Sequence, residues 1–443
     1  MHLESQYINL GDQRRNRRFI QMVNTFVKNP GCSVPHSMKR WYDVKATYGF
    51  WQSKHVSTPA MIDVLSKSTL QRAKECSVVL SVQDTTNVNF ASDAEDLGYL
   101  DHGKGLGLMC HNNLCISAQG NPIGLIDVYT WARPHEQMGI KKTRAKRPIE
   151  DKESYRWIAS KQKAESLLCD HVPQLVTIAD READLYELFC DPRPANSHLL
   201  IRAAHNRKTD TGYRLKELLN AEQVSHTKSL KIQRKTGKKY RIANFSIKHG
   251  SYTLKPPAKK DTLADIKLQA ILVQELRPEE GKKPIEWMLL STLPIENNTD
   301  LQTYVQWYAY RWLIERYHYV LKSGCGVEDL QLQSAKQLEK ALITFSLVAF
   351  KLLWLTYESR LNPHSPSDMI LEEEEWKVLC MSEHRKIKDS NPPKLKEAVR
   401  LIAMMGGFIG RKSDGDPGVK TLWQGMNRLQ ERVTMFKLMT NKE

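Results

Sequence analysis

Two short apolar runs, each leading to an aspartate, constrain the fold of this chain more than any other feature. Val78–Val82 leads to Asp84, and Leu175–Ala179 leads directly to Asp180. Apolar runs of this length are typical of buried strands in an α/β sheet. Carboxylates at the C-terminal ends of such strands emerge at the edge where open α/β sheets bind ligands. Either aspartate alone is also typical of a turn or a helix N-cap.

The order of the segments around these runs predicts a mixed sheet. Three apolar segments come first, then helix, strand, helix and strand; they lie at 78–83, 108–117, 122–131, 152–170, 175–179, 182–190 and 198–203. In a β-β-β-α-β-α-β order, three antiparallel strands lead into two parallel ones, with helices as crossovers. We therefore expect an α/β fold with a ribonuclease H-like core, a mixed five-stranded sheet flanked by helices.

Composition divides the chain into three predicted domains. Residues 1–70 are expected to form a helical DNA-binding domain, since basic residues that include Arg14 and Arg15 precede an aromatic cluster. A solvated basic face over an aromatic core is the alternative. Residues 71–360 are expected to form the catalytic core, which contains the basic stretch 141–147 and is interrupted by a basic, β-rich insertion at 205–300. Residues 361–443 are expected to be a helical C-terminal domain.

The charge of the chain points to an anionic partner. Its 443 residues include 66 Lys+Arg and 50 Asp+Glu, for a net charge of +16. Nucleic acids and membrane surfaces both suit such a charge. The longest apolar stretch, 341–350, is too short to span a bilayer, and we expect no membrane partner. The eight cysteines lack zinc-site spacing, which indicates reduced thiols in a cytoplasmic protein.

A third acid lies in a helix predicted at residues 300–322, among residues that suit phosphate. Relative to Tyr308, Arg311, Glu315 and Lys322 follow at +3, +7 and +14, which places all four on one helix face over about 21 Å. Arg, Lys and Tyr are typical phosphate contacts, although a surface stripe with ordinary helical pairing is the alternative. Together with Asp84 and Asp180, Glu315 is suited to hold a pair of Mg²⁺ ions.

These motifs resemble a known family. The Tyr-x₂-Arg-x₃-Glu-x₆-Lys spacing is similar to the YREK signature of bacterial DDE cut-and-paste transposases of the insertion-sequence-four family, Tn-five type. Further resemblances to that family lie in both aspartate motifs, in the strand that carries Arg202, in the segment around Trp287, in Leu10-Gly-Asp-x-Arg14-Arg15, and in the dimerisation region with Gly406-Gly-Phe408 and Leu422-Trp423-x-Gly425. The resemblance covers nearly the whole chain.

The resemblance implies an enzyme that cuts and joins DNA. Asp84, Asp180 and Glu315 would be catalytic and bind two Mg²⁺ ions, with Mn²⁺ able to substitute. The DNA-binding residues would be Tyr308, Arg311, Lys322, Trp287, Arg202, Arg14 and Arg15. Trp287 would stack on a flipped base while a hairpin forms and before the 3′-hydroxyl joins target DNA; a core tryptophan is the alternative role. Double-stranded transposon ends and target DNA would be the partners of a homodimer in the synaptic complex, in the bacterial cytoplasm and associated with the nucleoid.

The chain departs from the family pattern at three places, and two rival functions remain open. Tyr319 stands where the family has Lys, Leu108 and Met109 replace aromatic residues, and the chain begins several residues late, which predicts weaker recognition of the transposon end. One rival is a ribonuclease H-like nuclease without strand transfer; the basic insertion and Trp287 argue against it. The other is a non-catalytic DNA-binding transposition inhibitor; three intact acids argue against that.

Overall fold

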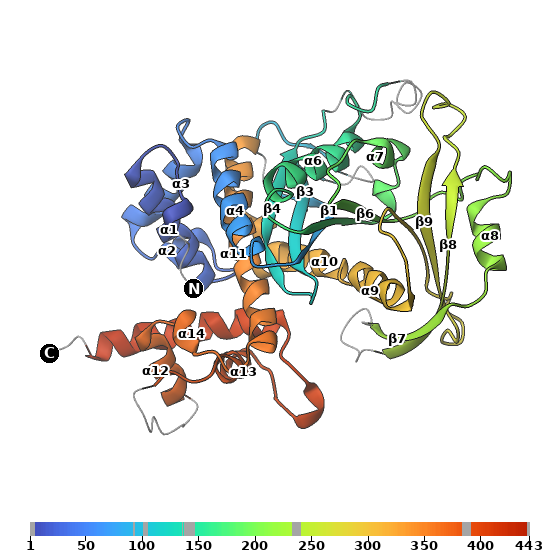
Figure 1. The fold of residues 1–443 in the computed structure, drawn as a ribbon. Helices are drawn as coiled ribbons and strands as arrows, with labels where there is room; N and C mark the ends of the chain where they lie inside the picture. The colour runs from blue at the N-terminus through green and yellow to red at the C-terminus, as the bar shows by residue number, and fades with distance from the viewer. Residues whose placement is uncertain are drawn as a thin grey trace.

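The computed structural model describes residues 5–91, 94–100, 105–134, 136, 147–232, 241–382 and 391–440. Most of the basic stretch 141–147, and the basic residues at 234–239, lie outside this part of the chain. A ten-stranded mixed sheet extends from a group of N-terminal helices at one end to a long β-rich extension at the other, while the C-terminal helices form a separate layer below (Figure 1). Within the described residues, no helix combines the length and the apolar character needed to cross a bilayer.

The central sheet contains the five predicted strands and continues through the insertion. Its strands are β1 (Val78–Asn89), β2 (Gly98–Tyr99), β3 (Leu106–Ser117), β4 (Pro122–Trp131), β5 (Gln174–Ala179), β6 (Ser197–Arg202), β7 (His226–Ile232), β8 (Arg241–Leu254), β9 (Ile266–Glu275) and β10 (Glu286–Ser291). The order is β2-β3-β1-β5-β6-β10-β9-β8-β7, with β4 paired to β3. Strands β1, β5 and β6 are parallel, and β10 adds antiparallel to β6. The insertion therefore lengthens the same sheet.

Helices cover both faces of the sheet. The α-helices of the described residues are α1 (Gln13–Lys28), α2 (Val34–Met38), α3 (Trp41–Gln52), α4 (Thr58–Ala73), α6 (Arg156–Leu168), α7 (Tyr186–Cys190), α8 (Leu215–Ala221), α9 (Asn298–Ala309), α10 (Trp312–Tyr319), α11 (Ala335–Leu361), α12 (Glu373–Ser382), α13 (Leu395–Met405) and α14 (Val419–Thr440), and only some of them pack on the sheet. Strand residues such as Leu80 and Val176 pack against α9, α10 and α11, whereas Ala179 and Leu199 pack on the opposite face with α6 and α7. Alternation along each strand thus builds two separate cores.

Strand β1 is longer than the sequence predicts. Asp84 does not end it, because the strand continues to Asn89. Antiparallel pairing with β3 extends from Val79↔Ser117 to Asn89↔Gly107, while parallel pairing with β5 stops at Val82↔Ile178. The expectation that this strand ends at Asp84 was therefore wrong, because β1 stays paired with β3 as far as Asn89. Only the pairing of β1 with β5 ends in this region, and Asp84 lies just beyond the last of those pairs.

The predicted continuous helix from residue 300 to residue 322 is also wrong in detail. Helix α9 ends at Ala309 and α10 begins at Trp312. Between them the backbone forms 3₁₀-type hydrogen bonds between residues three apart: Leu313 N donates to Tyr310 O (2.8 Å) and Ile314 N donates to Arg311 O (3.1 Å). A π-helical turn, Val320–Gly324, follows. Irregular turns of this kind are frequent at functional sites in helices.

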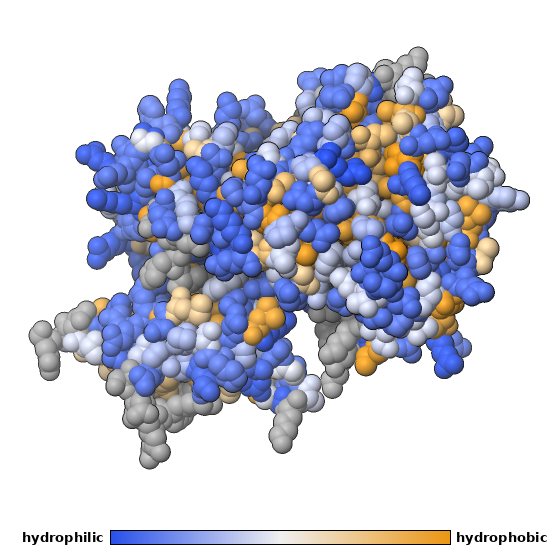
Figure 2. Space-filling view, viewed as in Figure 1, coloured by the Kyte–Doolittle hydropathy of each residue, from blue (hydrophilic) through white to orange (hydrophobic). Residues whose placement is uncertain are grey.

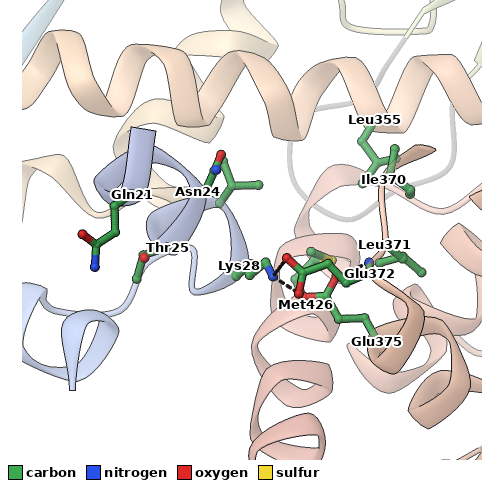
Figure 3. A pocket seen from close by; sticks show the side chains of 11 residues that line it. Gln21, Asn24, Thr25, Lys28, Leu355, Ile370, Leu371, Glu372, Glu375 and Met426 are labelled. Carbon is green, nitrogen blue, oxygen red and sulfur yellow. Dashed lines mark hydrogen bonds and ion pairs between the residues drawn. The ribbon is translucent and has the colours of Figure 1, made fainter. Parts of the chain in front are cut away.

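The N-terminal and C-terminal helices contact each other directly. Lys28, at the end of α1, forms ion pairs with Glu372 (2.6 Å) and with the buried Glu375 (2.9 Å), beside a cavity of about 250 Å³ (Figure 3). Gln430 on α14 donates to Glu375 Oε1 (2.7 Å). These contacts hold the N-terminal helices against the C-terminal layer. The visible surface of the N-terminal helices is mostly polar (Figure 2).

Helices α13 and α14 approach so closely that their contact requires glycine. A Cβ built on Gly425 would lie 1.7 Å from Ile402 O, and one on Gly406 would lie 1.8 Å from Thr421 O. Neither backbone carbonyl is able to give way without moving its helix. The two glycines therefore set the distance between these helices.

We predict that Gly425→Ala destabilises the C-terminal helices. The added methyl group must push α14 away from α13, and overpacking of this kind costs about 1–3 kcal/mol. Thermal unfolding followed by circular dichroism should show a melting temperature lower by a few degrees. Gly418→Ala is the matched control, because a Cβ there meets nothing within 4 Å. Equal melting temperatures for the two variants would contradict the prediction.

Candidate active site

The three predicted acids meet at one edge of the sheet. Asp84 lies on β1, Asp180 follows the neighbouring parallel strand β5, and Glu315 lies on α10, which packs against β1. Asp180 caps a short 3₁₀ turn by accepting from Glu182 N at 2.9 Å. The capping role considered from the sequence is therefore present. This cap occupies Oδ1 of Asp180, and Oδ2 is available to a ligand.

Burial makes Asp84 an unusual carboxyl group. Desolvation raises its pKa from 3.8 to about 7, although the positive charge of Arg311 opposes the shift. The negative charges of Asp180 and Glu315 raise the pKa further. Both acids are thus close enough to repel the Asp84 carboxylate, although burial is the larger cause of the raised pKa.

Arg311 lies between two of the three acids. Its Nη2 donates to Glu315 Oε1, and its Nη1 is 3.8 Å from Asp84 Oδ2. Because the chain turns tightly at residues 310–314, the Arg311 side chain starts at the beginning of α10 and reaches back toward β1. The guanidinium therefore bridges the helix and the strand.

Lys322 is also bound to an acid. Its Nζ donates to Asn87 O (2.8 Å) and forms an ion pair with Glu328 Oε1 (3.0 Å). Glu328 Oε1 in turn accepts from Asn89 N at 2.9 Å. Lys322 and Glu328 together tie the π-helical turn to the end of β1. The phosphate contacts expected of Arg311 and Lys322 stay predictions, and each side chain must leave a carboxylate to make them.

A second cluster adjoins the acids and contains Trp287, Tyr308 and Arg202. The Trp287 ring stacks on Phe245 at 6.0 Å and meets Tyr308 edge-on at 5.2 Å. Arg202 Nη2 donates to Glu286 O (2.9 Å). Burial raises the pKa of the Tyr308 hydroxyl, and the neighbouring Arg202 opposes this shift through its charge and a side-chain hydrogen bond. Among the described residues, Arg202 Nε has no hydrogen-bond partner. Such unpaired buried groups are expected to bond to a ligand or to water.

Arg14 and Arg15 lie apart from the acids. Both belong to α1, which α4 and α11 separate from the sheet (Figure 1). Arg14 is exposed, whereas Arg15 Nη1 donates to Leu10 O (2.7 Å) and His55 O (3.0 Å). Arg15 thus stabilises the loop before α1. The structure does not bring this pair to the other predicted site residues.

Sequence analysis missed His318. Its Nδ1 lies 3.9 Å from Asp84 Oδ2, and its Nε2 shares a hydrogen bond with Asn112 Oδ1 (3.0 Å). Burial lowers the pKa of His318 to about 3, so the ring is neutral and offers Asp84 no counter-charge. The sequence feature that could have identified His318 is its position three residues after Glu315, about one helical turn along the same face.

The carboxylates fit a divalent cation by chemistry. In the part of the chain that the structure describes, no three His, Cys, Asp or Glu side chains are already grouped around a metal position. Arg311 bridges Asp84 and Glu315. Carboxylate oxygens are the ligands that hard divalent cations prefer, and the Asp84 side chain is partly exposed (18%) and therefore open to such an ion. The donor set therefore fits such an ion once Arg311 moves aside.

Comparisons with known proteins identify the family of this chain. Three family models match successive parts of the chain: Transposase DNA-binding at residues 1–56, Transposase DDE domain at residues 159–350, and Transposase Tn5 dimerisation domain at residues 347–437. The DDE match contains Asp180 and Glu315, whereas Asp84 lies before it. The chain is a DDE transposase. The family expected from the sequence is thereby confirmed. DDE transposase domains generally use divalent metal ions.

The transposase also matches a solved structure, a piggyBac transposase synaptic complex with hairpin DNA. The identity is 9% and the TM-score 0.33, over 81% of this chain and 57% of that one. The transposase thus spans little more than half the length of that protein.

We predict that ionisation of Asp84 destabilises the metal-free transposase. The folded state holds the Asp84 proton up to about pH 7, whereas an unfolded aspartate loses it near pH 3.9. Stability should therefore fall as pH rises from about 4 to about 7. Melting temperatures between pH 5 and pH 8 should fall more for the wild type than for Asp84→Asn, and Mg²⁺ at pH 8 should restore only the wild type. Parallel pH profiles would contradict this.

Proposed function

We propose that this transposase cuts DNA at the ends of a mobile element and joins those ends to target DNA by a cut-and-paste route. The observation that carries the proposal is the convergence of Asp84, Asp180 and Glu315 beside Arg311 at one sheet edge. Asp84, Asp180 and Glu315 are the proposed catalytic and metal-binding residues. The strand order β4-β3-β1-β5-β6 supports a ribonuclease H-like core for this chemistry.

The proposed cofactor is a pair of Mg²⁺ ions, for which Mn²⁺ can substitute. When bound, such a pair supplies an activated attacking oxygen and stabilises the leaving oxygen. The side chains of the transposase position the DNA. Arg311 and Lys322 exchange Glu315 and Glu328 for phosphate oxygens, which keeps the charge of the site balanced. The exchange at Arg311 couples DNA binding to release of Glu315 for metal.

Trp287 is the proposed stacking partner of a flipped base. It is partly buried, and its neighbour Arg202 carries a buried Nε that lacks a partner among the described residues. Tyr308 and Arg202 are placed to donate to the backbone of a strand that enters beside the acids. After one strand is cut, the free 3′-hydroxyl would attack the other strand to give a hairpin while Trp287 holds the displaced base.

The proposed partners are two double-stranded DNA segments and a second transposase subunit. The DNA-binding and dimerisation matches support DNA binding and dimer formation. We place Arg14 and Arg15 among the contacts to the transposon end, and the protein in the bacterial cytoplasm, associated with the nucleoid.

One assay separates this function from its rivals. The transposase is incubated with Mg²⁺, a duplex bearing the inverted repeats that flank its own gene, and a supercoiled target plasmid. Integration of the duplex into the plasmid supports the proposal. Nicks without integration indicate a nuclease, and a shifted band without either product indicates a DNA-binding inhibitor.

We predict that Asp84→Asn, Asp180→Asn and Glu315→Gln each abolish cleavage and leave end binding largely intact. An amide is a poor ligand for Mg²⁺, whereas its size and shape match the acid. Asp210→Asn, at an exposed position, is the control and should cleave normally. Gel-shift and cleavage assays with the same duplex measure both properties. Near wild-type cleavage by any of the three variants would show that its acid is not a ligand.

We predict that Trp287→Ala slows hairpin formation about tenfold more than first-strand nicking. Nicking needs no extruded base, and loss of base stacking costs about 1–3 kcal/mol. Trp287→Phe keeps an aromatic ring and should lie between alanine and the wild type. Gel separation of nicked, hairpin and blunt products over time provides the rates. Equal slowing of both steps would mean that Trp287 only supports the Phe245 and Tyr308 packing.

A further inference from the structure

The imidazole ring of His318 lies over two neighbouring strands of the central sheet. Asp84 on β1 and Asn112 on β3 are direct partners across these strands, and side chains of such a pair point to the same face of a sheet. The ring of His318 lies between them: Nε2 is 3.0 Å from Asn112 Oδ1, and Nδ1 is 3.9 Å from Asp84 Oδ2. His318 thus joins the cross-strand pair to α10, the helix that carries Glu315.

The contact with Asn112 decides which ring nitrogen carries the proton. An amide oxygen only accepts hydrogen bonds, and Asn112 Oδ1 also accepts from Cys110 Sγ at 3.4 Å. Nε2 of His318 therefore donates. The ring is neutral, since burial lowers its pKa, and a neutral imidazole that donates through Nε2 has a lone pair at Nδ1. His318 thus presents an electron-pair donor atom on the side of Asp84.

The two carboxylate oxygens of Asp84 have different surroundings. Oδ1 accepts from Thr85 N at 2.9 Å. Oδ2 lies 3.8 Å from Arg311 Nη1 and 3.9 Å from His318 Nδ1, and both distances are too long for a hydrogen bond. Once Asp84 is ionised, Oδ2 and Nδ1 are two atoms with lone pairs that face each other and repel. A cation that binds both atoms turns this repulsion into attraction.

The spacing of these atoms suits a single metal ion. Ligands about 2.1 Å from an octahedral ion lie about 3 Å apart when adjacent and about 4.2 Å apart when opposite, and the 3.9 Å between Oδ2 and Nδ1 falls within that range. Glu315 and His318 form a Glu-x-x-His sequence, a spacing with which one helix supplies two ligands to a metal site. A ligating histidine almost always donates its other ring nitrogen to an acceptor, as His318 does to Asn112.

We propose that His318 Nδ1 is a nitrogen ligand of the divalent ion that Asp84 and Glu315 hold. The assignment rests on the proposed function, in which Arg311 leaves these acids for a phosphate and the ion takes its place. Imidazole nitrogen suits transition metals, whereas Mg²⁺ prefers oxygen ligands. His318 therefore makes this position bind Mn²⁺ more tightly than carboxylates alone would, and contributes to the metal preference of the transposase.

Pulsed electron paramagnetic resonance of bound Mn²⁺ tests the nitrogen ligand without turnover. The transposase is labelled with ¹⁵N-histidine, loaded with precleaved end duplex and given Mn²⁺. The echo modulation should show ¹⁵N coupling, and labelling the protein alone excludes nitrogen atoms of the DNA bases. His318→Gln should abolish this coupling, because glutamine still donates to Asn112 Oδ1 but has no nitrogen lone pair to offer. His171→Gln, at an exposed position, is the control and should keep it.

Metal affinity supplies a second measurement. Calorimetric titration of the same complexes should show Mn²⁺ binding to His318→Gln weakened about tenfold or more, since loss of even an outer-shell partner of a ligand costs about 10- to 100-fold. Mg²⁺ binding should weaken less. Equal losses for the two metals would contradict a nitrogen ligand.

The outcomes separate the ligand from the site as a whole. Bound Mn²⁺ without histidine coupling in the wild type would mean that Nδ1 carries the proton, and would overturn the proposal. Coupling that survives in His318→Gln would assign the signal to another histidine, with the same consequence. A wild type that binds no Mn²⁺, or whose Mn²⁺ binding is unchanged by Asp84→Asn, would refute the proposed metal-dependent function itself.

Discussion

The electrostatic balance around Asp84 is the constraint on which the rest of the site depends. A carboxyl group buried between β1 and α10, with Asp180 and Glu315 nearby, keeps its proton up to about pH 7 unless positive charge arrives. Arg311, at the start of α10, supplies part of that positive charge, and the neutral His318 supplies none. The adjacency of β1 and β5 and the tight turn before α10 place these groups together. A divalent cation or a DNA phosphate each changes this balance, which gives the site its sensitivity to both.

The break between α9 and α10 and the π-helical turn after α10 place charged side chains around Asp84 and the end of β1. A regular helix would carry Arg311, Glu315 and Lys322 along one face, facing a single surface. Instead, the 3₁₀ turn directs Arg311 toward Asp84, and the π-helical turn carries Lys322 to Asn87 and Glu328 at the end of β1. Gly324 lies in that turn against the Trp423 ring of α14, so that the catalytic edge and the C-terminal helices share a contact. Packing of the C-terminal layer therefore bears on the position of Lys322.

The sequence by itself determined the strand segments, the helical termini, the three acids and the family, because these depend on local periodicity and on the spacing of chemically distinct residues. The proximity of Asp84 and Asp180 also followed, since they come just after the paired stretch of the parallel strands β1 and β5, whereas the packing of α10 on β1 decided the position of Glu315. Only the tertiary structure decided where β1 ends, because pairing with β3 outlasts pairing with β5. It also decided the break at residues 310–314, the carboxylate partners of Arg311 and Lys322, and the neutral His318. These features depend on burial and on contacts between distant segments, such as Lys322 with Asn87, and no periodicity within one segment encodes them.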